Sequence, residues 1–450
     1  MTVTLIKTKT EQRLLADFEQ ARSALPGTGW VERLRRDSID AFGARGLPHR
    51  RIEEWKYTDL RERLTDVSAT AATSPRPTVN RKSVDRALGP LATLVAHRVV
   101  LLDGRYVAAL SDTGAFGVGV DFQTLGSALL APPDWLQAEI TPARAGPPDA
   151  IAALNLAFMT DGVLLQIAAD AAPTKPILIV NLRSKSGSGL IATRNVVHVG
   201  GGARVTLIEA HAALDGGPTN AQANVVTDVD VADRGAVVHV QIVADAPDTT
   251  HLAQWRVRIG GQANYRAFQL TAGVKLARNE LAIAFTGPDA KLDISGAFLG
   301  RGSDHIDTTL VVDHSTTGCE SRELFKGVLE DRARGVFQGK IIVQPEAQKT
   351  DGKQMAQVLM LSEDAEFDSK PELEIYADDV VCGHGSTVAE IDPAMVFYLR
   401  SRGIPLAEAR AMLTESFVVE AIEKVEDEAI REALMAIAVA WLRRSNPTKD

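Results

Sequence analysis

The sequence predicts a mainly β protein: a parallel β-helix (solenoid) core with helical regions at its N-terminal and C-terminal ends. Three observations support this fold class. Short β-branched runs, broken by Gly, Asp and Asn, fill residues 151–388. Several runs share one pattern, a turn residue followed by Ala and an alternating strand, and they recur at a nearly fixed interval. Amphipathic helices are missing between the turns, which argues against crossovers of the βαβ type.

We expect three regions along the 450 residues, because a chain of this length exceeds one ordinary core. Residues 1–95 are predicted to be an N-terminal helical region with a linker. Residues 96–390 are predicted to be the β-helix core, with regular repeats from about residue 151. Residues 391–450 are predicted to be a C-terminal helical region.

The N-terminal region has the spacing of amphipathic helices. Its first apolar positions recur at intervals of four, three and four residues and therefore share one helix face; they are Leu14, Phe18, Ala21 and Leu25. A Pro-Gly pair ends that helix, and the run WVERLRRDSIDAFGARG continues with a second one. The stretch SATAATSPRPT, residues 68–78, has the composition of a linker.

Alanines mark the repeat of the core. The first four are 33, 27 and 27 residues apart, and two more follow the same pattern further on; the six are Ala203, Ala236, Ala263, Ala290, Ala347 and Ala365. A β-helix explains this spacing through stacked turns. An antiparallel sandwich, whose strands also recur regularly, is the alternative.

The C-terminal region again predicts helices. Asp392 is a good N-cap, Pro393 suits the first helical position, and Gly403 stands where a helix should stop. Two further helices have helically spaced apolar positions: Leu406, Ala409, Leu413 and Phe417, then Ile430, Leu434, Ile437 and Trp441. We expect this bundle to cap the solenoid or to dock a partner.

Composition excludes several function classes. The chain has 49 basic and 58 acidic residues, a net charge of −9, which argues against nucleic acid as a partner. It has no apolar run near 18 residues, so no membrane span is expected, and its start lacks the apolar core of a signal peptide. Two cysteines cannot form a disulfide framework, so we expect free thiols in a reducing cytosol.

Nucleotide and hydrolase motifs are missing as well. GVFQGKII lacks the spacing and the Ser or Thr of a phosphate-binding loop. GGGARV leads into a strand rather than a helix, and GHGST is not a Gly-x-Ser-x-Gly elbow. The sequence therefore predicts neither an ATPase nor an α/β-hydrolase.

The stretch DDVVCGHGSTVAEID brings a cysteine and a histidine together. In an extended strand, Cys382 and His384 share one face and lie roughly 7 Å apart. They are candidate metal ligands, but a closed site needs four and no Cys-x-x-Cys lies nearby. The pair is half a metal site, a catalytic thiol with its base, or a strand that merely contains both residues.

Other candidate residues carry weaker signals. Asp228 and Asp230 share a strand face, an arrangement that β-helix lyases use for catalysis. His305, His314 and Cys319 lie close together in sequence and are interpreted as core or strand-end residues, with no ligand role assigned to Cys319.

Residues 334–404 closely resemble a known family. The elements that carry the resemblance are QKTDGKQ, LMLS, KPELEIYADDVVCGHGSTV and FYLRSRGI, and upstream EEWKYTDL and LNLAFMTDGVLLQI add to them. In these motifs the chain resembles the SufB/SufD family of iron–sulfur cluster assembly proteins, and its upstream motifs and length resemble the SufD branch. CGHGST departs slightly from the commoner CSHGAT of the family, but neither change removes a ligand.

The resemblance implies a β-helix with helical ends and a non-enzymatic scaffold that helps to acquire iron and to build and deliver clusters. The implied partners are a SufB-like paralogue and a SufC-like ATPase, the latter contacted by the helices from Pro405 to Trp441. It further implies that His384, and more weakly Cys382, are ligands at the SufB–SufD interface. Iron or an iron–sulfur cluster would be held transiently in the complex, and none is expected in the isolated chain.

An open-ended β-helix exposes unpaired strand edges, so the isolated chain is expected to form a two-fold homodimer. Two other interpretations stay open beside the cluster-assembly scaffold. One is a β-helix polysaccharide-active enzyme with stacked carboxylates. The other is a purely structural interaction protein without metal.

Overall fold

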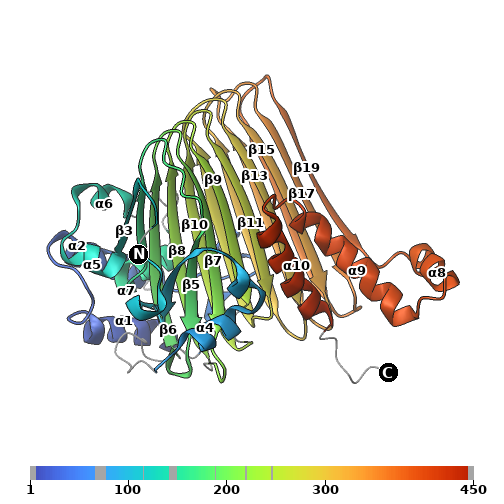
Figure 1. Ribbon diagram of the computed structural model, residues 1–450, viewed down its shortest axis with the longest axis horizontal. Coiled ribbons are helices and arrows are strands. Elements are labelled where there is room, and N and C mark those ends of the chain that lie inside the picture. The colour runs from blue at the N-terminus through green and yellow to red at the C-terminus, as the bar shows by residue number, and fades with distance from the viewer. Residues whose placement is uncertain are drawn as a thin grey trace, which may run out of the picture.

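The computed structural model describes residues 7–65, 78–114, 116–140, 149–187, 189–217, 220–244 and 247–443. Two large sheets face each other, and from β4 onward successive strands alternate between them (Figure 1). The predicted linker, residues 68–78, lies outside the described residues except for Thr78.

In the described part of the chain, the first sheet has ten strands in the order β19-β17-β15-β13-β11-β9-β7-β5-β1-β2. Their bounds are β1 His97–Leu102, β2 Arg105–Tyr106, β5 Ile177–Arg183, β7 Arg204–Ala213, β9 Ala236–Ala244, β11 Asn264–Ala272, β13 Lys291–Gly300, β15 Glu320–Leu329, β17 Asp351–Met360 and β19 Val381–Ala389.

The second sheet, counted over the same described residues, has nine strands in the order β18-β16-β14-β12-β10-β8-β6-β4-β3. Their bounds are β3 Val120–Thr124, β4 Val163–Ile167, β6 Gly189–Val199, β8 Ala221–Val231, β10 Thr249–Ile259, β12 Leu276–Phe285, β14 His305–His314, β16 Arg334–Val343 and β18 Glu366–Ile375.

Strand pairing confirms the β-helix. Every neighbouring pair is parallel except β1 with β2 and β3 with β4. An antiparallel sandwich is therefore excluded. Buried apolar side chains from both sheets fill the interior, as Trp255, Tyr265 and Phe285 illustrate.

The alanine repeat reflects one corner of the solenoid. Ala203, Ala263 and Ala290 each come directly before a strand of the first sheet and are at most 1% exposed, so only a small side chain fits there. Three of the predicted members were misplaced: Ala236 is the first residue of β9, one position past this corner, Ala365 comes before β18 in the second sheet, and Ala347 lies in the turn ahead of β17. The sequence pattern merged different corners, because each of them needs a small buried residue.

Helices α1, α2 and α7 cover the outer face of the second sheet, whereas α4 packs Val84 and Leu88 against the first sheet. Leu14, Phe18 and Phe42 of α1 and α2 form one buried cluster with residues of α7 and with Leu190 and Leu252 of the sheet. The helix bounds in this half of the chain are α1 Lys9–Ala21, α2 Trp30–Arg45, α3 Leu60–Arg63, α4 Arg81–Leu88, α5 Leu125–Leu130, α6 Asp134–Glu139 and α7 Ala150–Phe158.

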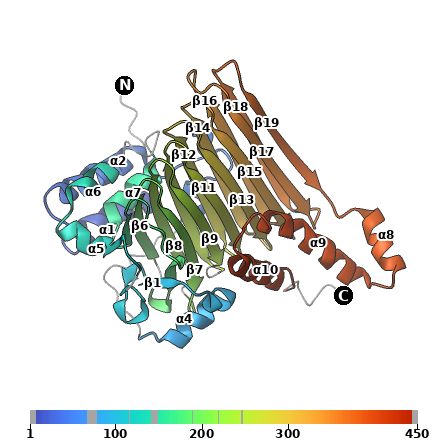
Figure 2. The same ribbon diagram turned by 45° about the horizontal axis from the view of Figure 1, so that its top comes forward.

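The C-terminal helices α8 (Pro393–Ser401), α9 (Leu406–Ile422) and α10 (Glu428–Arg443) do not cap the solenoid. Figures 1 and 2 show α9 and α10 lying along the outer face of the first sheet, while α8 projects beyond β19. The expectation of an end-cap was wrong. The outer face of the first sheet is itself apolar, as Ile242 and Phe268 illustrate, and α9 and α10 bury it.

Helix α8 starts and stops where the sequence predicts. The Asp392 carboxylate accepts a hydrogen bond from the Ala394 N–H at 2.8 Å, Pro393 is the first helical residue, and Gly403 adopts φ of 86° just after the end. Among the described residues, no helix has the length and apolarity needed to cross a membrane.

Candidate functional site

The last strand of the first sheet carries Cys382 and His384. In the described part of the chain β19 pairs with β17 alone, so its other edge is open. The register places Cys382 beside Gly352 and His384 beside Gln354. The pair therefore lies on the terminal turn of the solenoid.

The register also settles which way these side chains face. On β17, Gln354 and Ala356 are 3% and 1% exposed and face the interior, whereas Met355 between them is exposed. Residues paired in register share a face of the sheet. Cys382 and His384 therefore both face the interior side and are neighbours on one strand face, as the alternation predicts.

The opposite wall of this open end comes from β18, whose inward residues pair in register with interior residues of β16. Leu373 of β18 and Cys382 both pack against the buried Ile341 and Val343. Cys382 is consequently half-buried, whereas His384 is exposed. An incoming group thus meets the imidazole first and the thiol second.

A buried polar cluster lies directly behind the pair. Gln354 donates from Nε2 to Glu323 Oε2 at 2.6 Å, and the Ser321 hydroxyl donates to Glu323 Oε1 at 3.2 Å. The same hydroxyl is 3.1 Å from His314 Nε2. Burial raises the pKa of Glu323 to about 7, although its two hydrogen bonds favour the charged form.

The Cys382 thiol does not resemble a catalytic nucleophile. Burial raises its pKa above the ordinary value, and the negative charges of Asp351 and Glu323 add to the effect, while a hydrogen bond from the Gly352 backbone opposes it. Reactive thiols have a lowered pKa, supplied by a nearby cation or base. No hydrogen bond between Cys382 and His384 is present among the described contacts, which leaves the thiol without its base.

The number of ligands limits what this end can bind alone. Among the described residues, no group of three or more His, Cys, Asp and Glu side chains is placed to hold a metal ion. Cys382 and His384 supply one soft and one borderline ligand on an accessible face. A four-ligand site here requires groups from outside the described chain.

The three residues that lie close together in sequence upstream do not form a site. His305 and His314 stand at opposite ends of β14. His305 links the N-terminal region to the second sheet. Its Nε2 lies 2.8 Å from Thr58 Oγ1, and its Nδ1 lies 3.0 Å from Arg63 Nη2. Cys319 is fully buried just before β15, in the same kind of corner as Ala290, and its pKa is raised by burial.

The two carboxylates proposed for a lyase are not arranged as an open acid pair. The Asp228 side chain is 0% exposed and is held by Arg256, with Nε at 2.7 Å and Nη2 at 3.1 Å, and by Arg194 Nη2 at 2.9 Å. Asp230 lies 4.0 Å from Arg258 Nε and is 20% exposed. Substrate has no access to the first carboxylate.

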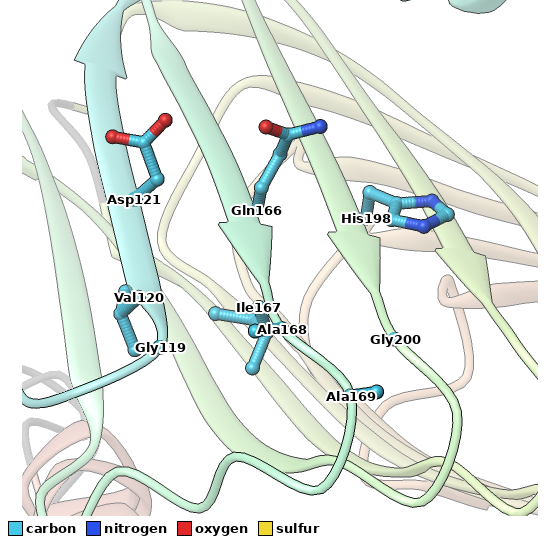
Figure 3. Close-up of a pocket in the computed structure, with 9 residues that line it drawn as sticks. All are labelled: Gly119, Val120, Asp121, Gln166, Ile167, Ala168, Ala169, His198 and Gly200. Carbon is cyan, nitrogen blue, oxygen red and sulfur yellow. The ribbon is translucent and has the colours of Figure 1, made fainter.

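Two of the hollows formed by the described residues lie away from this end. The hollow in Figure 3 is lined by Asp121, Gln166 and His198, which occupy one register row across β3, β4 and β6. It offers one carboxylate and one imidazole, and among the described residues no third His, Cys, Asp or Glu joins them to hold a metal ion. A larger hollow, about 750 Å³, lies between residues 44–55 and the second sheet, and its Arg278 is engaged by Asp307 and by the Trp55 ring, 3.9 Å away.

Sequence reasoning missed Glu323 and Gln354. Gln354 stands inside the QKTDGKQ motif, but nothing in the sequence says that it pairs with His384. That pairing depends on the exact lengths of the two turns that separate β17 from β19. Glu323 is a further turn away, and its SRELF surroundings resemble any half-buried strand.

Comparison with known proteins identifies the family. Residues 8–179 match the family model described as the SufBD protein N-terminal region, and residues 182–417 match that of the SUF system FeS cluster assembly, SufBD core domain. The iron–sulfur cluster assembly protein SufD of Escherichia coli K12 is 31% identical over 401 residues, 87% of this chain and 88% of the relative. A SufBD family protein of Synechocystis sp. PCC 6803 is 28% identical over 431 residues, 93% of each chain. The chain therefore belongs to the SufBD family and within it is most like SufD.

Proposed function

We propose that this chain is a non-catalytic scaffold subunit of the SUF system, which works with a SufB-like paralogue and a SufC-like ATPase to acquire iron and to build and deliver iron–sulfur clusters. The cluster is its cargo. One observation carries the proposal: an exposed His384 stands beside a half-buried Cys382 at the open end of the solenoid. Family membership supports the assignment to the SUF system.

The open end fits a partner with the same architecture. A paralogue that adds its own terminal strands to β18 and β19 continues both sheets and satisfies their free backbone groups. It also brings ligands of its own, a thiolate above all, to the face that holds His384. Both cysteines of this chain are free thiols, which fits the reducing cytosol that we propose as its compartment.

Co-purification with the two partners tests the proposal. The tagged chain is co-expressed with its SufB-like and SufC-like neighbours, and the complex is reconstituted anaerobically with iron and sulfide. We expect a stable complex with bound iron, sulfide and visible absorbance. A complete complex that acquires none of them would contradict the proposed role.

Without its partner, the isolated chain should form a two-fold dimer through the open edge of β19. Val381 donates its N–H to Thr350 on the β17 side. Because alternate residues of a strand point their backbone groups to opposite sides, the Ser386 N–H points to the open edge. Ser386→Pro removes that donor without touching the ladder to β17 and should yield a monomer of 48.3 kDa.

Sedimentation velocity over a range of concentrations checks this prediction. Ser386→Ala is the matched control, because it keeps the backbone donor and should remain dimeric. A wild-type chain that stays monomeric at every concentration contradicts the edge-to-edge model.

The resemblance assigned the ATPase contact to the helices from Pro405 to Trp441, and we propose a site that starts earlier and includes α8. The apolar face of α10 is not available to a partner, because its Ile430 and Leu434 are buried against the first sheet. Helix α8 buries no residue, and Phe397 is 74% exposed. We therefore place the ATPase on α8 and the start of α9, where the exposed apolar side chains are Met395, Phe397, Tyr398, Leu406 and Met412.

A charge on α8 should break the ATPase contact. Phe397→Asp places a carboxylate in the centre of the apolar patch and should weaken co-purification of the ATPase by about 30-fold, the effect of losing one interface hot spot. Binding is measured by titrating purified ATPase against the tagged chain. Val118→Asp, at a residue 99% exposed in the N-terminal half, is the control and should bind normally. Removing everything after Gly403 is a poor test, because it uncovers the apolar face beneath α9 and α10.

A further inference from the structure

Three side chains on successive turns line up behind the open end. The register places Glu323 of β15, Gln354 of β17 and His384 of β19 in one row across the first sheet. Glu323 and Gln354 are each 3% exposed, and His384 is exposed. Neighbouring strands are about 4.8 Å apart, so each side chain is within reach of the next.

In its ionised form, which the hydrogen bonds from Gln354 and Ser321 favour, the Glu323 carboxylate fixes the orientation of the Gln354 amide. Gln354 Nε2 donates to Glu323 Oε2 at 2.6 Å, and an inverted amide would set two oxygens against each other. Gln354 Oε1 is therefore turned away from Glu323. It is buried and accepts no hydrogen bond from any described residue. A buried acceptor without a donor is unfavourable, so this oxygen is available to the next group in the row.

The opposite sheet leaves room for this amide. Gly339 lies on β16, and a Cβ added there would overlap the Nε2, Cδ and Oε1 atoms of Gln354. Gly339 is not in a left-handed conformation, so its backbone alone does not require glycine. The missing side chain instead makes the space that the Gln354 amide occupies.

We propose that Glu323 and Gln354 form a positioning relay for His384. In this arrangement Gln354 Oε1 accepts the N–H of one ring nitrogen of His384, so the imidazole is held in one tautomer. The other nitrogen then presents its lone pair to the cargo at the open end. Histidine ligands of metals almost always donate their second N–H in this way, and the partner sets both tautomer and ring orientation.

This relay rests on the proposed role of His384, but different results of the same experiment would contradict the relay and the proposed function. The test measures iron(II) binding by the purified complex, with iron(II) alone as the probe, for His384→Ala, Gln354→Leu and the double variant. We expect Gln354→Leu to weaken iron binding by about 10- to 100-fold. The double variant should be no weaker than His384→Ala, because the amide acts only through the imidazole.

Three outcomes are decisive. If His384→Ala binds iron normally, the proposed function falls. If His384→Ala weakens binding and Gln354→Leu does not, the relay alone falls. If the losses in the double variant simply add, Gln354 acts elsewhere and the relay is again overturned. Gln357→Leu, on the outward-pointing side of the same strand, is the matched control and should bind like wild type.

A spectroscopic readout separates positioning from mere support of the fold. In the isolated chain with ¹⁵N-labelled histidine, the His384 ring should show one tautomer in the wild type and an average of two in Gln354→Leu. Glu323→Gln serves as a second variant if Gln354→Leu does not fold, because it removes the charge that fixes the amide and should also mix the tautomers. An unchanged ring spectrum in both variants contradicts the relay.

Discussion

His384→Ala should reduce the iron and cluster content of the purified complex by more than tenfold while leaving the fold and partner binding intact. The imidazole is exposed on the terminal strand, so its removal opens no cavity in the core. Loss of a group that only orients a ligand already weakens metal binding by about 10- to 100-fold. Loss of the ligand itself should have at least that effect.

Cys382→Ser is the informative companion to this variant. The thiol packs partly against Ile341 and Val343, and burial raises its pKa, so it must lose a proton unfavourably before it binds iron. We therefore expect a smaller reduction than for His384→Ala. Iron, acid-labile sulfide and visible absorbance of the reconstituted complexes give the comparison. Wild-type cluster content in His384→Ala would contradict the ligand role and favour the alternative that this strand merely contains both residues.

The architecture could be predicted from sequence because each turn of a β-helix needs the same local sequence pattern. A small residue, a turn and an alternating strand recur, and Ala203, Ala263 and Ala290 satisfy the same corner. Alternation alone also places Cys382 and His384 on one face. Each of these predictions depends on contacts within one turn or between adjacent turns, and such contacts leave a local pattern in the chain.

The arrangement of the C-terminal helices could not be predicted in the same way. Their apolar spacing shows that one face is buried, but it does not say against what. The signal lies in the strands that they cover: Val240 and Ile242 face outward on β9, and Phe268 and Leu270 do so on β11. An outer face that is apolar requires a cover, and α9 and α10 provide it. In the run AVVHVQIVAD, Val238, Val240 and Ile242 alternate on the outward face, and this apolar spacing carried that information.

The row behind His384 is beyond sequence reasoning for a different reason. Glu323, Gln354 and His384 become neighbours only when two whole turns of the solenoid have closed with fixed lengths. A shift of one residue in either turn would place Lys353 or Met355 beside His384 instead. The identity of a partner side chain across the sheet therefore follows from the register, and the register follows from the whole solenoid.

Asp228→Ala should lower the free energy of unfolding by about 3–5 kcal/mol, because it leaves buried guanidinium groups without their carboxylate. Arg256 and Arg194 bind Asp228 from two sides, and all three side chains are at most 5% exposed. Asp230→Ala, two residues further along the same strand face, is the matched control. Its partner Arg258 is 49% exposed and 4.0 Å away, so the change should stay within about 1 kcal/mol.

Denaturation midpoints of the two variants decide between a structural and a chemical role for these acids. A solenoid can unfold in parts, so the midpoint is followed by both far-ultraviolet circular dichroism and tryptophan fluorescence, with Trp255 reporting the interior near Arg256. The catalytic acid of a lyase must be accessible to substrate, and its replacement by alanine should cost little stability. Asp228→Ala with a wild-type midpoint would favour that role. A large loss in Asp228→Ala beside a small one in Asp230→Ala means that the carboxylate serves the fold, and the polysaccharide-active interpretation then has no catalytic acid at this position.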